Sequence, residues 1–264
     1  MPSQGDKADA FRALHEGDPF VIPNPWDAGS ARVFEALGFT ALATTSSGFA
    51  FTLGRLDGTV TLDEIVDHTQ ALDAASALPV SVDLENGYGP DPEQAAAAIT
   101  AAARSGAVGG SIEDWDRDDG ELYSLDHAVE RVAAAVEAAG ALDFPFTLTA
   151  RAENHIRDNP DLEDTIARLQ AYEEAGADVL YAPGLRNAED VRTVCAAVSR
   201  PVNVLAHPGL SMREVVEAGG QRVSVGGGLT WVGLAATVAA AERIRDDGDF
   251  SVLGAQVHLK DWLA

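Results

Sequence analysis

The sequence has little cysteine and little lysine. Its single cysteine, Cys195, excludes an internal disulfide framework and a cysteine-cluster metal site, and it favours a reducing compartment. The two lysines, Lys7 and Lys260, lie near the two ends of the sequence. Enzymes that form a Schiff base need a lysine in the body of the fold. The sequence therefore argues against a Schiff-base mechanism.

Positive charge is also scarce. The 264 residues include 18 basic and 42 acidic ones, so the formal net charge at pH 7 is −24. Such a charge opposes binding to nucleic acid or to an anionic membrane. No apolar run reaches the roughly 18 residues of a membrane span, and the first residues lack the pattern of a secretion signal. We therefore expect a cytoplasmic globular protein with no nucleic-acid or membrane partner.

Short apolar segments alternate with alanine-rich helical segments along the chain. Continuous β-branched runs are typical of parallel strands covered on both faces. The expected strands cover residues 20–23, 40–45, 79–83, 108–114, 146–151, 178–183, 201–206 and 222–227. The expected helices cover residues 27–37, 61–77, 91–105, 124–139, 161–175, 187–198, 211–218 and 229–245.

Eight strand–helix units in succession predict a single-domain α/β fold, a TIM-type (β/α)8 barrel over residues 1–264, with a doubly wound open sheet as the alternative. In this prediction residues 1–18 form an N-terminal helical lead-in and residues 246–264 a C-terminal tail. The chemistry of such barrels lies at the carboxyl ends of the strands. The residues that end the strands are therefore the candidate site residues.

Carboxylates gather at the ends of the third and fourth expected strands. Asp83 and Glu85 are two residues apart and face one side, and Glu113 and Asp114 end the next strand. Such a group of acids would repel itself without a cation, and oxygen ligands suit Mg²⁺ or Mn²⁺. The alternative is that these acids cap loops or pair with arginine.

Arg151 ends the fifth expected strand, with Glu153 on the same face. An arginine inside a ring of acids is either a structural counter-ion or a fork for a substrate carboxylate or oxyanion. The segment TTSSGFAF follows the second strand, and most of its residues are small, including one glycine. Its backbone N–H groups are therefore a candidate site for binding an anion.

Five motifs in order resemble those of the isocitrate lyase/phosphoenolpyruvate mutase superfamily over nearly the whole chain. They are NPWDAGSARV, TTSSGF, VDLENGYG, SIED and TARAEN. The resemblance implies a barrel that binds Mg²⁺ and a 2-oxo or 2-hydroxy acid. It also implies cleavage or formation of a C–C or P–C bond next to a pyruvate enolate.

The resemblance implies a role for each motif's residues. Asp83 would be the direct metal ligand, with Mn²⁺ as a possible substitute for Mg²⁺, while metal-bound water would be held by Glu85, Glu113 and Asp57. The substrate carboxylate would be held by backbone N–H groups and one hydroxyl in Ser47, Gly48 and Phe49. Arg151 would bind the same acid and stabilise the enolate oxygen, where negative charge develops.

The sequence departs from the superfamily's carbon–carbon lyases after the fourth strand. Those lyases carry a catalytic cysteine and lysines there, whereas residues 114–124 read DWDRDDGELYS. Cys195 falls in the sixth expected helix and is interpreted as a packing residue. His207 follows the seventh strand, where the lyases have asparagine, and is a candidate proton donor to the enolate. The alternative is an exposed loop histidine.

The acidic loop 114–124 disfavours highly charged substrates. The leading hypothesis is a Mg²⁺-dependent lyase that cleaves a C–C bond of a small 2-oxo or 2-hydroxy acid by a retro-aldol step or decarboxylation, with Arg151, His207 and Glu113 as catalytic residues. The alternatives are a P–C bond enzyme, either a phosphonomutase or a phosphonopyruvate hydrolase, and a catalytically silent carboxylate-binding barrel. The missing Thr-Asn loop of the mutase weakens the first alternative.

The last expected helix is rich in alanine and is followed by an apolar tail. In resembling proteins this helix packs on the barrel of a neighbouring subunit, which implies a homodimer or homotetramer. The alternative is an ordinary eighth helix that closes its own barrel.

Overall fold

The computed structural model describes residues 1–255 and 257–263, and it has eight parallel strands in one sheet. The strands run in the order β1-β10-β9-β8-β7-β4-β3-β2. Their bounds are β1 Phe20–Ile22, β2 Leu42–Ala43, β3 Val80–Asp83, β4 Gly109–Glu113, β7 Thr147–Arg151, β8 Val179–Tyr181, β9 Val202–Leu205 and β10 Arg222–Ser224. The Ala43 N–H donates to the carbonyl of Pro23 at 3.0 Å, which joins the two ends of the sheet. The predicted barrel is confirmed.

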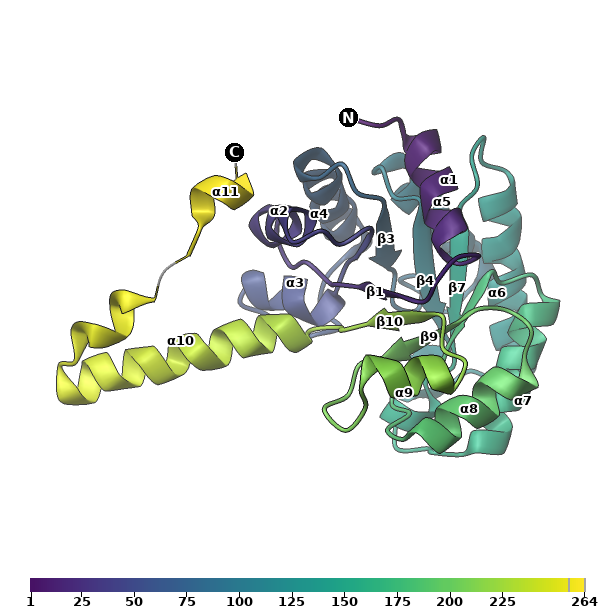
Figure 1. The fold of residues 1–264 in the computed structure, drawn as a ribbon. Helices are drawn as coiled ribbons and strands as arrows, with labels where there is room; N and C mark the ends of the chain where they lie inside the picture. Colours follow the sequence, from purple (N-terminus) through teal and green to yellow (C-terminus); the bar gives the residue numbers. More distant parts are fainter. Residues whose placement is uncertain (256, 264) are drawn as a thin grey trace.

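The helices that follow the strands surround the barrel (Figure 1). They are α2 Ala28–Ala36, α4 Leu62–Ala75, α5 Pro92–Arg104, α6 Leu125–Gly140, α7 Leu162–Glu174, α8 Ala188–Ala197 and α9 Met212–Glu217. Several begin where the sequence places a cap: Thr61 and Glu64 form a capping box at α4, and the Ser124 hydroxyl accepts from His127 at α6. None of the described helices is long and apolar enough to cross a membrane.

Shorter elements lie in the connections. After β2 comes α3 (Ser46–Thr52), and after β4 a hairpin of β5 (Trp115–Asp116) and β6 (Glu121–Leu122). A 3-10 turn, η1 (Asn154–Ile156), follows β7. These connections lie at the carboxyl ends of their strands, so they surround the mouth of the barrel.

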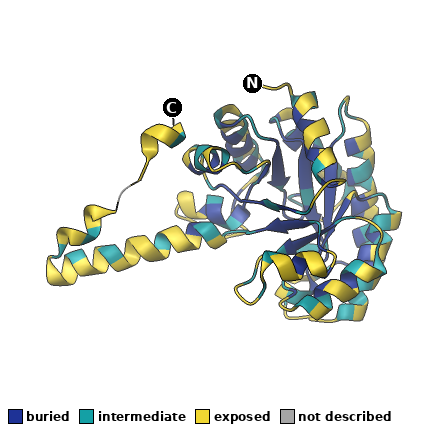
Figure 2. Ribbon diagram, in the orientation of Figure 1, coloured by how far each residue is buried: buried dark blue, intermediate teal, exposed yellow. Residues whose placement is uncertain are grey.

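The strands alternate between a helix-facing and a barrel-facing side chain. In β3, Val82 packs with α5 in the apolar core, while Ser81 and Asp83 line the interior cavity. The same alternation runs through the other strands, and Figure 2 shows the strands as the buried centre of the fold. The inward residues are mostly small and polar, whereas branched apolar residues usually fill such barrels. The barrel interior is therefore partly hollow.

The N-terminal helix α1 (Gln4–Leu14) covers the amino ends of the strands. Its Phe11 packs with Phe20, Ala41 and Val108, which lie at the start of strands or just before them. A Cβ on Gly109 would lie 2.7 Å from the Phe11 ring, so glycine is required where the helix approaches β4. The predicted lead-in helix therefore closes one end of the barrel and leaves the other end open.

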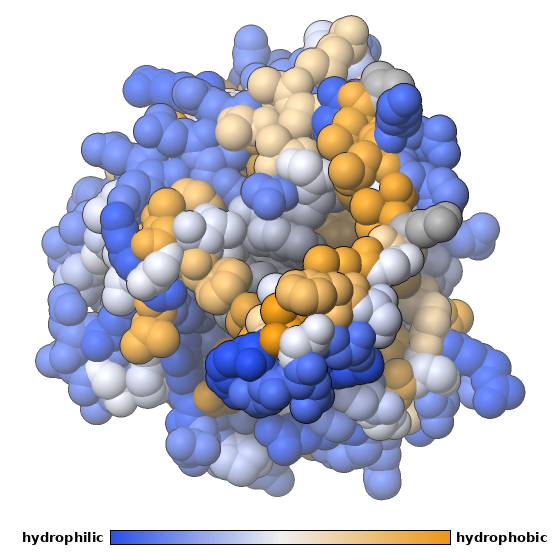
Figure 3. Space-filling model, turned by 90° about the vertical axis from the view of Figure 1, so that its left-hand side faces the viewer, coloured by the Kyte–Doolittle hydropathy of each residue, from blue (hydrophilic) through white to orange (hydrophobic). Residues whose placement is uncertain are grey.

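The last long helix, α10 (Gly228–Asp247), projects away from the barrel rather than covering it (Figure 1). Thr230 is its buried residue, while Trp231 is 42 % and Val232 66 % exposed. The chain then forms η2 (Phe250–Gly254) and α11 (Leu259–Leu263), which lies against α2. Figure 3 shows apolar side chains gathered around a hollow on this side of the molecule. The helix α10 therefore does not pack on its own barrel as an ordinary eighth helix would.

Candidate active site

A polar cavity of about 200 Å³ opens at the carboxyl ends of the strands. Its lining includes Asp57, Asp83 and Arg151 near the mouth and Arg222 deeper in the barrel. A larger hollow of about 690 Å³ lies at the opposite end, around the amino ends of β7 and β8. Because barrels of this type carry their chemistry at the carboxyl ends of the strands, we take the smaller cavity as the candidate site.

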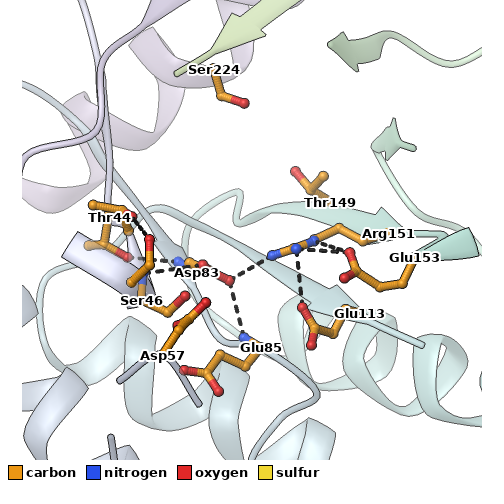
Figure 4. Close-up of polar contacts among 12 residues, drawn as sticks. Thr44, Ser46, Asp57, Asp83, Glu85, Glu113, Thr149, Arg151, Glu153 and Ser224 are labelled. Carbon is orange, nitrogen blue, oxygen red and sulfur yellow. Dashed lines mark hydrogen bonds and ion pairs between the residues drawn. The ribbon is translucent and has the colours of Figure 1, made fainter. Parts of the chain in front are cut away.

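Arg151 is the centre of this site (Figure 4). Its Nη1 lies 2.8 Å from Asp83 Oδ1 and its Nη2 lies 3.1 Å from Glu113 Oε2. Its Nε and Nη2 both donate to Glu153 Oε1, at 3.1 and 2.8 Å. The guanidinium also lies over the Tyr181 ring, 5.3 Å from the ring centre. One cation thus holds carboxylates from three neighbouring strand ends.

Two of these carboxylates are buried. Glu113 is 4 % and Glu153 0 % exposed, and Arg157 reaches them at 3.4 and 3.3 Å. Burial, and then the charge of Glu153, raise the pKa of Glu113 well above its ordinary value. Burial lowers the pKa of Arg151, but its carboxylate neighbours outweigh burial and hold it well above the ordinary value. Arg151 therefore stays charged, and its charge opposes the effect of burial on the pKa of Glu113 and Glu153.

Asp83 is oriented by the chain around it. Its backbone N–H donates to Thr44 Oγ1 at 2.8 Å, which fixes the end of β3. Its carboxylate accepts from the N–H of Glu85 at 3.2 Å and, less closely, from that of Ser46 at 3.4 Å. Charge-assisted bonds of this kind stabilise the ionised carboxylate. Asp83 thus presents an oriented carboxylate to the cavity.

Glu85 and Asp57 lie on the mouth side of Asp83. Glu85 is 1 % exposed and has a backbone φ of 52°, the left-handed region that is uncommon outside glycine. Its carboxylate forms an ion pair with Arg117 of the β5–β6 hairpin. Asp57, an exposed residue between α3 and α4, points toward Asp83 in Figure 4. Burial lowers the pKa of Arg117, and the charges of Asp57 and Asp83 oppose that change only in part, so this guanidinium lies among the acids.

The oxygen atoms of these acidic side chains are of the chemical type that binds a hard divalent cation. Asp57, Asp83, Glu85 and Glu113 supply carboxylate oxygens, the ligands that Mg²⁺ prefers. Glu85 Oε1 is buried and has no hydrogen-bond partner in the described ranges, as expected for an oxygen that awaits a cation or its water. In the same ranges no three acidic, histidine or cysteine side chains converge to metal-binding distance. Instead, the arginine side chains lie among these carboxylates.

The residues expected to hold a substrate carboxylate form the first turn of α3. Ser47 lines the cavity, whereas Gly48 and Phe49 are not among the lining residues. The Gly48 N–H donates to Thr45 Oγ1 at 3.3 Å, and the Phe49 N–H donates to the Thr45 carbonyl at 3.0 Å. The Phe49 ring stacks on His68, away from the cavity. The cap and helix bonds of α3 therefore use two of the N–H groups that were expected to bind substrate.

His207 does not reach the cavity. It lies in the turn after β9, where its Nδ1 accepts from the Gly209 N–H at 3.1 Å, and it is not a lining residue. Cys195 lies on α8, partly buried against the apolar core, which agrees with a packing role. The Asp114 side chain does not line the cavity either. Its carboxylate accepts hydrogen bonds from the Tyr172 hydroxyl, the Arg168 guanidinium and the Glu153 N–H.

The sequence alone does not identify four of the residues that form this site. The sequence places Glu153 on the face of Arg151 without indicating a role, and it indicates no site role for Arg117, Arg157 or Tyr181. Arg117 is the only basic residue in the acidic stretch 114–124, and that contrast is the signal that could have found it. Arg157 lies over the Trp115 ring at 4.7 Å, a contact between separate loops that no local pattern reveals.

Comparison with known proteins agrees with this architecture. Residues 11–245 match the family model of phosphoenolpyruvate phosphomutase. A solved structure from Burkholderia cenocepacia J2315, described as a lyase/mutase, shares 52 % identity, with a TM-score of 0.95 over 98 % of this chain and 95 % of the other. An oxaloacetate decarboxylase of Bradyrhizobium diazoefficiens is 30 % identical over 91 % of this chain and 83 % of its own length.

A third similar protein contains a small dicarboxylate. The structure of oxaloacetate acetylhydrolase in complex with the product oxalate has a TM-score of 0.88 and 26 % identity, over 100 % of this chain and 95 % of the other. The barrel, the strand-end acids around Arg151 and these matches lead to one conclusion. The chain belongs to the phosphoenolpyruvate phosphomutase family, within the isocitrate lyase/phosphoenolpyruvate mutase superfamily.

Proposed function

We propose that this protein is a cytoplasmic, Mg²⁺-dependent lyase that cleaves a C–C bond of a small 2-oxo or 2-hydroxy acid, by decarboxylation or a retro-aldol step. The observation that carries the proposal is Arg151, held by Asp83, Glu113 and Glu153 at the mouth of a polar cavity. Relatives that act on oxaloacetate support the substrate class.

Arg151 would bind and orient the substrate. A guanidinium has five N–H donors in a planar fork that matches a carboxylate or an enolate oxygen. Its carboxylate partners fix the fork before substrate arrives, so little reorganisation is needed as negative charge develops. Ser47, whose side chain reaches the same cavity, would take one oxygen of the substrate carboxylate through its hydroxyl.

Asp83 would hold the metal directly, with Glu85, Glu113 and Asp57 around it. When bound, Mg²⁺ would supply Lewis-acid polarisation of a substrate oxygen. Arg117 would have to leave Glu85 for this to happen, because its guanidinium lies where positive charge is needed.

The size and charge of the site favour a small acid. The cavity volume of about 200 Å³ lies below the roughly 300–1,000 Å³ that is usual for sites of drug-sized ligands. Asp116, Asp118, Asp119 and Glu121 flank Arg117 in the sequence of the neighbouring loop, and their field opposes a substrate with many negative charges.

Oxalate, a flat mimic of an enolate, tests the proposal by calorimetric titration. We expect oxalate to bind in the presence of Mg²⁺ and to bind at least about tenfold more weakly in EDTA, because both the cation and Arg151 would hold it. Equal affinity with and without Mg²⁺, or no binding at all, would overturn the metal-dependent site.

We also propose that the protein is a homodimer or homotetramer in which α10 packs on a second copy. The helix leaves its own barrel uncovered and exposes Trp231, Val232 and Val238, and monomers rarely leave such a surface open. Sedimentation should give a multiple of 27.6 kDa, and Val232→Glu should lower that mass. A wild-type mass of 27.6 kDa would contradict the assembly.

A further inference from the structure

A second arginine lies inside the barrel, and no carboxylate balances its charge. Arg222 begins β10 and is 5 % exposed. Its guanidinium forms three hydrogen bonds, all to neutral groups, and no ion pair with any acid in residues 1–255 and 257–263. A buried charge without a counter-charge is costly, so proteins normally pair it.

The three acceptors come from separate elements. Nε of Arg222 donates to Asn203 Oδ1 at 2.8 Å, Nη2 donates to Thr149 Oγ1 at 2.9 Å, and Nη1 lies 3.1 Å from His15 Nε2. A guanidinium has five N–H groups, so two remain for a further acceptor. The side chain is thus fixed in place without being saturated.

His15 supplies no counter-charge. Its Nδ1 lies 2.9 Å from the Phe11 carbonyl and is assigned as the donor, which leaves Nε2 to accept from Arg222. Burial, and then the charge of Arg222, lower the pKa of His15 to about 3. Burial lowers the pKa of Arg222 to about 10, and it still carries its charge at neutral pH. The pair is therefore one cation and one neutral ring.

Arg222 lines the deep part of the same cavity that Arg151 lines at its mouth. The lining of this cavity includes three serines, Ser81, Ser111 and Ser224. Figure 4 shows Thr149 and Ser224 on the far side of Arg151 from Glu113, away from the acids. Hydroxyl and guanidinium donors without nearby carboxylates form an environment that suits an anion rather than a cation.

We propose that Arg222, with the serine hydroxyls that line the same cavity, forms an internal binding position for one small monovalent anion of the carboxylate class. The position shares one cavity with Ser47 and the acid cluster but uses a different cation, Arg222, and it does not rest on the proposed function. The anion would complete the charge balance of Arg222 and accept its two remaining N–H groups. It would be either a free ion or one arm of a bound substrate.

Sodium formate in EDTA-containing buffer tests this by thermal unfolding, against the sodium salt of HEPES at equal ionic strength, whose anion is too bulky for the position. At roughly ten times its dissociation constant, formate should raise Tm by about 3 °C in the wild type. Arg222→Met should lose this shift and Ser47→Ala should keep it. An equal shift in wild type and Arg222→Met would overturn the proposal.

A second measurement needs no variant, so it decides the question even if Arg222→Met does not fold. In a crystal of the wild type soaked in bromide, anomalous scattering should place an ion at hydrogen-bond distance from the Arg222 guanidinium. No bromide at that position would overturn the proposal. If oxalate with Mg²⁺ then displaces the bromide, the position takes a substrate arm, and if both remain, it takes a free anion. Failure of oxalate to bind would count against the proposed function alone.

Discussion

Replacing Arg151 with methionine is expected to lower the free energy of unfolding by about 3–5 kcal/mol at pH 7, the usual cost of leaving a buried charge unpaired. The substitution strips Asp83, Glu113 and Glu153 of the cation that they share. Chemical denaturation of wild type and variant, followed by far-UV circular dichroism, measures the difference.

The pH dependence of this loss has a definite sign. Without Arg151, the folded-state pKa of Glu113 and Glu153, which burial already raises, should lie further above the unfolded values. Their protonated forms then favour the folded state, so the deficit of the variant should be smallest at low pH. It should grow as pH rises from the ordinary glutamate range toward and through the raised pKa values.

Arg157→Met is the matched control. Arg157 contacts the same two glutamates but is 31 % exposed, and water screens what it contributes. We expect a loss of about 1 kcal/mol or less. If Arg151→Met is no more destabilised than this control, Arg151 is not the centre of the charge balance.

The second large effect is expected for Asp83→Asn, which keeps the shape of the side chain and removes its charge. Affinity for Mn²⁺, measured by electron paramagnetic resonance of the free ion, should fall at least about 100-fold. Changing a residue that only supports a metal ligand already lowers affinity by about 10- to 100-fold, and loss of a direct ligand should cost at least as much. The melting temperature serves as the check that the variant is folded. Unchanged Mn²⁺ affinity in a folded variant would remove Asp83 from the metal site.

Arg117→Met is expected to raise the affinity for Mn²⁺, the opposite of the effect expected for Asp83→Asn. Its guanidinium contacts Glu85 and lies near Asp57 and Asp83, so it competes with a cation for these oxygens. Removing it should raise Mn²⁺ affinity by about tenfold, or about 1.4 kcal/mol. Arg213→Met, on the exposed surface of α9, changes the net charge equally and should have little effect. Equal responses would mean that overall charge, and not position, matters.

The sequence predicts the positions of the strand-end residues well, for a physical reason. Asp83, Glu113 and Arg151 each follow a continuous apolar run, and parallel strands bring their carboxyl ends to one rim. Register then pairs Glu113 with Arg151 across β4 and β7, and Asp83 reaches Arg151 from β3, one strand further along the sheet. Local patterns of this kind need no knowledge of distant contacts.

Other features depend on contacts that no local pattern contains. TTSSGFAF was expected to be an open anion cradle, but Thr45 caps it into α3 and uses the N–H groups of Gly48 and Phe49. The direction of α10 is set by the turn at Gly226 and Gly227, and a Cβ on Gly227 would lie 2.7 Å from both Ser47 and Trp231. The unbalanced charge of Arg222 is visible only once the strands and α1 are placed around it.

The central claim is metal-dependent cleavage of a C–C bond in a small acid, and turnover tests it most directly. The purified protein is incubated with Mg²⁺ and, separately, with oxaloacetate, alkylmalates and phosphonopyruvate, while 2-oxo acid products, carbon dioxide and phosphate are measured. We predict turnover of oxaloacetate or an alkylmalate that stops in EDTA and in Asp83→Asn, with no release of phosphate. Phosphate release from phosphonopyruvate alone, or binding of oxalate without turnover of any acid, would contradict the account.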